Sequence, residues 1–284
     1  MTVEKIECWV FRAPIERPVT AAVGSMTNRP AVFVRIRADD GAWGWGEVFC
    51  NFPTVGAEHR ARLLREVVAP LLQGMRSDQP GEVWAALTAK LRRMALQAGE
   101  PGPVAQVLAA VDQALWDMQA RRAGKPLWRL LADDPSADGR VRPYASGLGP
   151  DGVVEAALAA GENIRGHADF DAAIAAGHLR FIQPDVAKWG GITGCLEVAR
   201  RAERAGLVYC PHWLGGGIGL AASLHLRAAL GPTGLAEIDA NPNPLREAVF
   251  ALPPMYDGWL TLPEAPGLGV EPDLAALRRY RSDA

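Results

Sequence analysis

Four residues that can exchange protons or bind a cation recur at nearly equal intervals in the second half of the sequence. They are Glu162, Asp185, His212 and Glu237, and each interval has the length of one strand and one helix with their turns. An aspartate beside a histidine orients the imidazole, which can then take up or give a proton near neutral pH. The spacing therefore predicts proton-transfer chemistry at one site.

The stretch from 181 to 220 indicates which elements position these groups. Phe181 and Ile182 form a short apolar strand, the glycine pair at 190–191 breaks the chain, and apolar residues then recur at helical spacing before a second strand at 207–209. This is one βα unit followed by the strand of the next. Because the carboxyl ends of parallel strands meet at one edge, we expect all four groups to line one mouth.

Ordinary structural roles compete with this interpretation. Acidic residues are common in surface loops, and Lys188 is equally consistent with a surface ion pair. His225 falls inside an apolar helix predicted over 220–230, where a packed or hydrogen-bonded histidine is the more frequent case. The regular series favours a shared site for Asp185 and His212.

Composition excludes several classes of function. The chain has 284 residues, is 49% hydrophobic and carries a net charge of -2, without a basic patch that would predict nucleic-acid binding. No apolar run approaches the roughly 20 residues that span a bilayer, and the opening stretch MTVEKIECWV lacks a signal-peptide core. The four scattered cysteines predict free thiols, and we expect a cytoplasmic protein with no membrane partner.

The sequence divides into three parts. Residues 1–135 read as an α+β domain, with a three-stranded antiparallel meander followed by helices. Between the first two strands, the stretch 18–30 (PVTAAVGSMTNRP) predicts a mobile surface loop that closes over a ligand. Residues 136–250 alternate as βα units, beginning with a strand at 141–146 and a helix at 151–160. The tail, 251–284, is expected to pack back on the first domain.

Several segments together resemble the mandelate racemase and muconate lactonizing enzyme group of the enolase superfamily. The matching segments keep the family order, and they are GWGE at 44–47, VDQALWD at 111–117, GEN at 161–163, QPDVAKWGG at 183–191, CPH at 210–212 and AE at 236–237. The ending, from Asn243 to Gly269, is most similar to the sugar-acid branch of dehydratases and galactarolactone cycloisomerase.

The resemblance implies a capping domain over a TIM-type β/α barrel, and abstraction of the proton beside a carboxylate to give an enediolate stabilised by Mg²⁺. It makes His212 the general acid/base and Asp185 its orienting partner. It also makes Glu237 a hydrogen-bonding partner of the substrate carboxylate and Lys188 a supporting polar residue. Glu162 matches the third of three acidic metal ligands. For substrate binding, it points to three residues of the capping loop, Met26, Asn28 and Arg29.

The sequence departs from the family pattern between Ser146 and Glu162. The family places a Lys-x-Lys pair and two further metal-binding acids there, but only the short stretch 147–161 intervenes, and it contains no lysine. An eight-unit barrel takes roughly 200 residues or more, and the range 141–246 supplies roughly half of that length. We therefore expect a shortened barrel of about five units, or a sequence that omits an internal segment of the molecule.

A shortened barrel has consequences for assembly and for metal binding. Open sheet edges and an exposed apolar face are costly, so we expect a homo-oligomer that covers them. Magnesium requires several oxygen ligands, and Glu162 alone cannot hold it tightly unless waters or a neighbouring chain supply the others.

Three functions remain open at this stage. The first is a Mg²⁺-dependent dehydratase or racemase acting on a small hydroxy or sugar acid, and the second is an inactive, truncated relative that persists as a folded oligomer or carboxylate-binding module. The third is a dinucleotide-binding protein, suggested by the glycine-rich turn at 215–219, the helix after it and Asp239 beyond that helix. The sequence does not specify the substrate or the stereochemical course.

Overall fold

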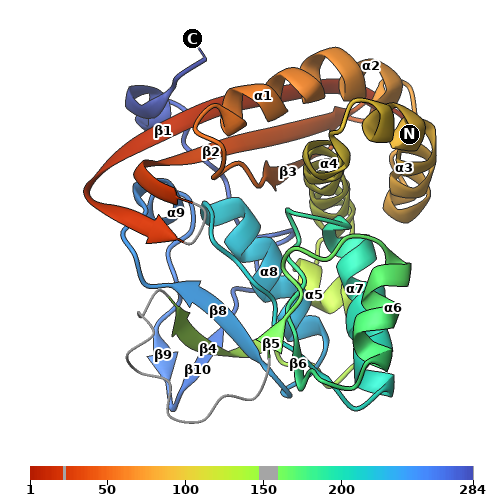
Figure 1. The fold of residues 1–284 in the computed structure, drawn as a ribbon, viewed down its shortest axis with the longest axis vertical. Helices are drawn as coiled ribbons and strands as arrows, with labels where there is room; N and C mark the ends of the chain where they lie inside the picture. Colours follow the sequence, from red (N-terminus) through yellow and green to blue (C-terminus); the bar gives the residue numbers. More distant parts are fainter. Residues whose placement is uncertain (22–23, 147–158, 284) are drawn as a thin grey trace.

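The computed structural model describes residues 1–21, 24–146 and 159–283. An α+β cap, formed by the first half of the chain, lies across the top of the molecule in Figure 1, with the βα units below it. Two hydrophobic cores follow this division. One lies inside the cap, and the other joins the βα units to the underside of the cap.

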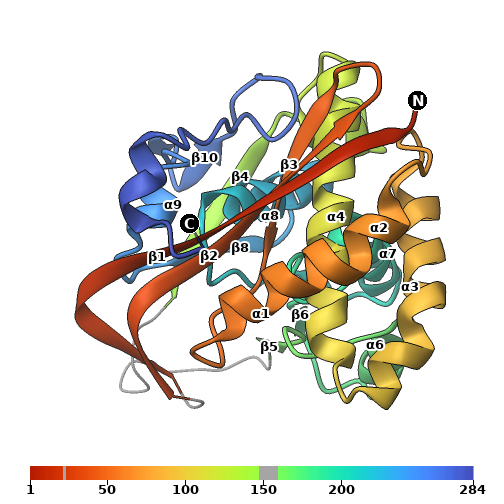
Figure 2. The same cartoon turned by 90° about the horizontal axis from the view of Figure 1, so that it is seen from above.

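The cap sheet is antiparallel, in the order β1–β2–β3. Its strands are β1 (Val3–Ala21), β2 (Gly24–Ala38) and β3 (Trp43–Val48). The prediction of a surface loop at 18–30 is wrong for the described residues, because Val19 of β1 pairs with Met26 of β2, and Thr20 pairs with Ser25. Backbone hydrogen bonding to the facing strand outweighs the polar, Gly-bearing composition that indicated a loop. Figure 2 shows the β1–β2 ribbon crossing over α8.

Helices follow the sheet in the sequence, and they are α1 (Gly56–Arg62), a π-helical turn η1 (Leu63–Val68), α2 (Ala69–Leu72), α3 (Pro80–Gln97), α4 (Pro101–Arg122) and α5 (Leu127–Leu131). Of these, α1, η1 and α4 pack on the sheet, whereas α3 packs on α4, and α5 packs on α8 of the second domain. Helix α4 packs directly on β3. A Cβ atom at Gly44 or Gly46 would lie 2.0 Å from a carbonyl oxygen of α4. Glycine at these two positions therefore permits the close approach of helix and strand.

The second domain carries five parallel strands among its described residues, divided between two sheets. They are β4 (Arg140–Ser146), β5 (Ala159–Ala160), β6 (Phe181–Ile182), β7 (Val208–Tyr209) and β8 (Leu235–Asp239). One sheet has the order β5–β6–β7, and in the other β8 pairs with β4. The backbone amide of Leu235 donates to Sγ of Cys210 at 3.3 Å, which links the ends of the two sheets.

Helices follow three of these strands. They are α6 (His167–Ala175), α7 (Gly191–Arg204) and α8 (Gly217–Ala229). The helix predicted at 151–160 falls mostly outside the described residues, and its last two residues form strand β5. No helix in the described part of the chain is both long and apolar enough to cross a membrane.

The C-terminal segment returns to the cap. It comprises α9 (Pro244–Glu247), the hairpin β9 (Met255–Tyr256) and β10 (Trp259–Thr261), and the 3₁₀ turn η3 (Ala276–Tyr280). Strand β10 pairs antiparallel with the start of β4. The backbone of Arg281 then forms an isolated antiparallel β-bridge with Phe11 of β1, and the Ser282 amide donates to the carbonyl oxygen of Val10 at 2.9 Å. In Figure 1 this segment is the dark blue trace that ends beside β1.

Candidate functional site

Asp185 and His212 form a hydrogen-bonded dyad at the tips of two neighbouring parallel strands. Phe181 of β6 pairs with Val208 of β7, so the residues that follow the two strands emerge side by side. The Nδ1 atom of His212 lies 2.7 Å from Oδ2 of Asp185, whose side chain is fully buried. The other oxygen of Asp185 accepts the amides of Ala187 and Lys188, which fixes the carboxylate. The arrangement orients Nε2 of the imidazole away from Asp185.

Glu162, which follows β5, contacts the Nε2 atom of His212. Its Oε2 atom lies 2.7 Å from Nε2 of His212, and its Oε1 atom lies 3.3 Å from Nζ of Lys188. The Lys188 ammonium also donates to Oδ1 of Asn163 at 3.2 Å and lies 4.6 Å from the centre of the Phe49 ring. Two cations therefore hold one carboxylate at the centre of the site.

Glu237, on β8, closes the site on the side of the second sheet. Its Oε2 atom lies 3.9 Å from Nε2 of His212 and accepts the amide of Trp213 at 2.8 Å. The structure thus brings together, as the His212 cluster, the five residues that the sequence and the resemblance assigned to one mouth: Glu162, Asp185, Lys188, His212 and Glu237.

The charges of this cluster shift the pKa values of two members. Burial lowers the pKa of His212, but hydrogen bonds to Asp185 and Glu162 outweigh it and raise the pKa to about 10. The hydrogen bond from His212 is the largest influence on Glu162 and lowers its pKa to about 2, against the effect of burial. At neutral pH the pair is an imidazolium and a carboxylate.

Two further residues at this mouth were missed by the sequence analysis. Nε2 of Gln183 donates to the hydroxyl of Tyr144 at 2.9 Å, which joins the tip of β6 to β4 across the two sheets. Tyr144 stands opposite Glu237 in the β4–β8 ladder. Burial, reinforced by the negative charge of Glu237, raises the pKa of its hydroxyl. The only sequence signal was the place of both side chains near strand ends.

The three capping residues predicted to bind substrate do not join this cluster. Arg29 is 1% exposed, and its Nη2 atom lies 2.6 Å from Oδ2 of Asp239 in a buried ion pair. Asn28 accepts a hydrogen bond from Arg12, and Met26 is buried. Among the described residues, no hydrogen bond or ion pair connects the three to His212. Arg29 thus joins the cap to the end of β8, and substrate binding by the three residues stays a prediction.

The glycine-rich turn before α8 binds a carboxylate of the protein itself. The amide of Gly216 donates to Oε1 of Glu47 at 2.5 Å, and the amide of Gly219 donates to Oε2 at 3.0 Å. Glu47 belongs to β3 of the cap and is 1% exposed. Because its carboxylate occupies the helix N-terminus that a pyrophosphate would use, the dinucleotide interpretation is wrong.

Asp112 of α4 binds the start of α7 in the same way. Its carboxylate accepts the amide of Thr193 at 2.9 Å and the Thr193 hydroxyl at 2.6 Å. Burial raises the pKa of both Glu47 and Asp112 to about 7, against the hydrogen bonds that favour their charged forms. Two cap carboxylates thus fix the helices that begin after the Asp185 and His212 loops.

The magnesium ion implied by the resemblance does not fit the donor set of this site. Mg²⁺ prefers octahedral coordination by oxygen atoms. Both oxygens of Glu162 face cations, His212 and Lys188. Within residues 1–21, 24–146 and 159–283, no group of three or more His, Cys, Asp or Glu side chains is arranged to hold a metal ion.

An α+β cap that places buried carboxylates on the helices of a barrel-like domain, above a histidine–carboxylate cluster at strand tips, defines a two-domain protein of enolase type. Residues 5–132 match the N-terminal domain model of mandelate racemase and muconate lactonizing enzyme, and residues 140–276 match the enolase C-terminal domain-like model. The chain belongs to the mandelate racemase and muconate lactonizing enzyme group of the enolase superfamily.

Individual relatives agree with this assignment. A mandelate racemase/muconate lactonizing enzyme of Bordetella bronchiseptica RB50 has a solved structure that is 37% identical, with a TM-score of 0.82 and 99% of each chain covered. The D-galactarolactone cycloisomerase of Agrobacterium fabrum is 24% identical, with 99% of each chain covered. The D-galactonate dehydratase of Ralstonia nicotianae is 33% identical over 172 residues, 57% of this chain and 44% of the relative.

The alignment with the cycloisomerase also shows a difference in length. It runs over 386 positions, whereas this chain has 284 residues, so the relative carries segments that this chain lacks. The two domain models leave only residues 133–139 between them.

Proposed function

We propose that this protein is a lyase or isomerase that binds a small hydroxy or sugar acid at the His212 cluster and transfers the proton beside the carboxylate. The observation that carries the proposal is the 2.7 Å contact between Nδ1 of His212 and the buried carboxylate of Asp185. This contact leaves Nε2 as the nitrogen that exchanges a proton with a ligand. Relatives named as a sugar-acid dehydratase and a cycloisomerase support the reaction class.

Glu162 marks where a substrate carboxylate would bind. Its two oxygens contact the cations of His212 and Lys188, and its side chain is 39% exposed, so it can be displaced toward solvent. A carboxylate of the substrate would take its place beside the Lys188 ammonium, and the carbon next to that carboxylate would face Nε2 of His212. Glu237, whose Oε2 atom lies 3.9 Å from Nε2, would donate a hydrogen bond to that carboxylate, or to the enediolate formed from it, when it carries a proton.

Displacement of Glu162 also changes the acidity of His212. The imidazole then keeps one of its two hydrogen-bonded carboxylates, and its pKa falls from about 10. In a dehydration, the neutral imidazole takes the proton from the carbon beside the carboxylate, and the electron pair enters the enediolate. The imidazolium then gives that proton to the hydroxyl on the next carbon, which leaves as water. Lys188 stabilises the enediolate charge.

A second candidate is a carboxylate-binding module without turnover. It is favoured by the occupied state of the site, in which an internal carboxylate already neutralises the imidazolium. It is also favoured by the donor set, which does not fit the metal that stabilises the enediolate elsewhere in the family.

Exchange of the substrate proton with solvent separates the two candidates. The protein is incubated in D₂O with a panel of sugar acids that includes D-galactonate, and proton NMR follows loss of the signal beside the carboxylate and appearance of a dehydrated product. The enzyme hypothesis expects exchange or product with one panel member, abolished in His212→Asn. Saturable binding without exchange would support the binding module. If neither exchange nor binding occurs, both candidates are contradicted.

We further propose that the second domain is a shortened barrel of about five βα units that pairs with a second copy. Support comes from the order β5–β6–β7, in which β5 and β7 are the edge strands among the described residues, and from the added positions in the cycloisomerase alignment. An unpaired edge strand favours association. The intact mass measured against the 284-residue sequence tests the shortened chain, and light scattering after gel filtration tests the dimer.

A further inference from the structure

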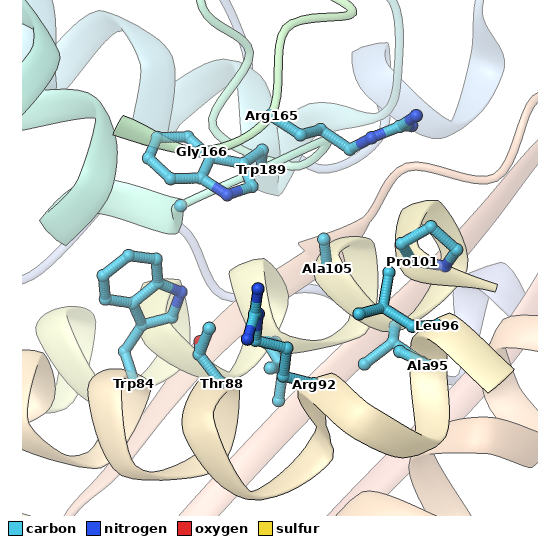
Figure 3. Close-up of a pocket in the computed structure, with 13 residues that line it drawn as sticks. Trp84, Thr88, Arg92, Ala95, Leu96, Pro101, Ala105, Arg165, Gly166 and Trp189 are labelled. Atoms are coloured by element: carbon cyan, nitrogen blue, oxygen red, sulfur yellow. The ribbon is translucent and has the colours of Figure 1, made fainter. Parts of the chain in front are cut away.

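A cavity of about 250 Å³ lies between the cap and the second domain, outside the His212 cluster. Helices α3 and α4 form its floor, and the segments at 165–166 and 189–190 form its roof (Figure 3). An apolar cavity of about 150 Å³ admits benzene in another protein. The present cavity therefore has room for a benzene ring that carries a small substituent. Interfaces between domains are frequent places for ligand sites.

The walls of the cavity are aromatic and aliphatic. The indole rings of Trp84, on α3, and Trp189 pack edge to face, with ring centres 5.7 Å apart. Aliphatic groups complete the lining on the α3–α4 side, and they are Ala95, Leu96, Pro101, Val104, Ala105 and Leu108. Such a lining favours a flat apolar body, because indole rings pack well against other aromatic rings.

The polar side chains that line the cavity are two arginines and a threonine, all of which can donate hydrogen bonds. Arg92 rises from α3 beneath Trp189, and Arg165 extends along the opposite wall (Figure 3). Among the residues that the structure describes, neither guanidinium has an ion-pair or hydrogen-bond partner, and no acidic side chain lines the cavity. The buried Oγ1 atom of Thr88, also in the wall, has no hydrogen-bond partner in the described part of the chain.

The backbone adds positive potential at the same place. Gly166 and Gly190, which line the cavity, are the N-cap residues of α6 and α7, and Pro101 is the first residue of α4. Helix N-termini carry partial positive charge that favours anions. Arginine binds a carboxylate through two parallel hydrogen bonds, which makes that group the best match to the two guanidiniums.

From these observations we propose that the cavity binds a small aromatic carboxylate. Its ring packs against the sides of Trp84 and Trp189 that line the cavity, and its carboxylate contacts Arg92 and Arg165. This site is distinct from the His212 cluster, although its walls continue into that cluster. Trp189 directly follows Lys188, and Arg165 lies shortly after Glu162 in the sequence.

Calorimetric titration of the full chain with sodium benzoate tests the proposal. We expect saturable binding at about millimolar concentration or tighter, accompanied by a change in tryptophan fluorescence. Arg92→Gln and Arg165→Gln should each weaken the binding about tenfold or more, because each removes a charge-assisted hydrogen-bonding partner. Benzyl alcohol, which keeps the ring and lacks the charge, should bind more weakly than benzoate.

Two control variants make the result specific. Arg93→Gln removes the same charge from the next position of α3, which does not line the cavity, and should leave the affinity unchanged within about twofold. His212→Asn should also leave benzoate binding intact. The proposal is overturned if no saturable binding occurs, if Arg93→Gln weakens binding as much as Arg92→Gln, or if only His212→Asn abolishes it.

Discussion

Glu162 places one carboxylate oxygen 2.7 Å from Nε2 of His212, the nitrogen that faces away from Asp185. The two residues follow different strands, β5 and β7, and meet because β6 pairs with both. The contact occupies the position at which a substrate would exchange a proton. The charge of the His212 imidazolium is therefore neutralised by a residue of the protein itself, and proton transfer to a substrate requires this ion pair to open.

Replacing Glu162 with glutamine should lower the pKa of His212 from about 10 toward its ordinary value of 6.5. The substitution removes one of two charged hydrogen-bond partners and leaves Asp185 in place. The protein has five histidines, so an NMR pH titration of imidazole signals can resolve the change.

The matched control for this measurement is Glu197→Gln. Glu197 contacts another histidine, His167, at 3.3 Å, so its replacement should leave the titration of His212 unchanged. The ion pair of His212 and Glu162 stabilises the fold only within a limited pH range. Because the pKa of His212 is raised, its contribution to stability is complete below about pH 6.5 and disappears as the pH rises toward 10. Because the pKa of Glu162 is lowered, its contribution is complete above about pH 4.5 and disappears as the pH falls toward 2. An unchanged His212 titration in Glu162→Gln would contradict this account.

The residues of the site could be predicted because βα units impose their own period. A titratable group in or just after each strand, at nearly equal intervals along the sequence, was enough to place Asp185, His212 and Glu237 together. The partner choice of Glu162 could not be predicted in the same way. Which cations Glu162 contacts depends on the side chains that surround it in the folded protein, and these come from several strands.

Contacts between distant segments were also beyond sequence reasoning. Arg29 and Asp239 are 210 residues apart and neutralise each other in a buried pair, which no local pattern indicates. The same holds for Gln183 and Tyr144, which meet across two sheets. The polar, Gly-bearing composition of 18–30 indicated a loop, whereas its described residues belong to the paired strands β1 and β2.

Glu47→Gln should change how stability depends on pH. The folded state raises the pKa of Glu47 from 4.5 to about 7, so between these values it holds a proton that the unfolded state has lost. The free energy of unfolding of the native protein should therefore fall as pH rises through this range. The glutamine variant lacks this contribution, and relative to the native protein it should gain up to about 3 kcal/mol between pH 5 and pH 8.

Urea unfolding at several pH values measures this difference. Glu66→Gln provides the control, because Glu66 is an exposed helix residue whose side chain lies 3.6 Å from Arg62. Its variant should follow the native pH dependence throughout. Parallel curves for the native protein and Glu47→Gln would show that the carboxylate at the start of α8 does not titrate in this range.

Magnesium should have little effect on this chain. Both oxygens of Glu162 are committed to His212 and Lys188, and the described residues contain no three-ligand group. We expect no stoichiometric heat in a titration with Mg²⁺ at micromolar protein, and no change of melting temperature after treatment with EDTA. Tight one-to-one binding that is lost in Glu162→Gln would show that the ion pair opens to form a metal site.

Gly219→Ala should destabilise the protein strongly, because the first turn of α8 has no room for a side chain. A Cβ atom at this position would lie 2.0 Å from the Trp213 ring, which is 1% exposed and cannot move aside. Trp213 follows His212 directly, and its amide binds Glu237, so the displacement would also disturb the His212 cluster. Overpacking of this kind costs about 3 kcal/mol.

Gly81→Ala is the matched substitution in another helix, α3. Its added Cβ would meet only Thr193 side-chain atoms, the nearest at 3.4 Å, which is an ordinary contact. Alanine is the better helix former, so this variant should be neutral or more stable by up to about 1 kcal/mol. Thermal and urea unfolding of the two variants compare the costs directly, and equal stability of the two would mean that Trp213 does not pack against Gly219 as described.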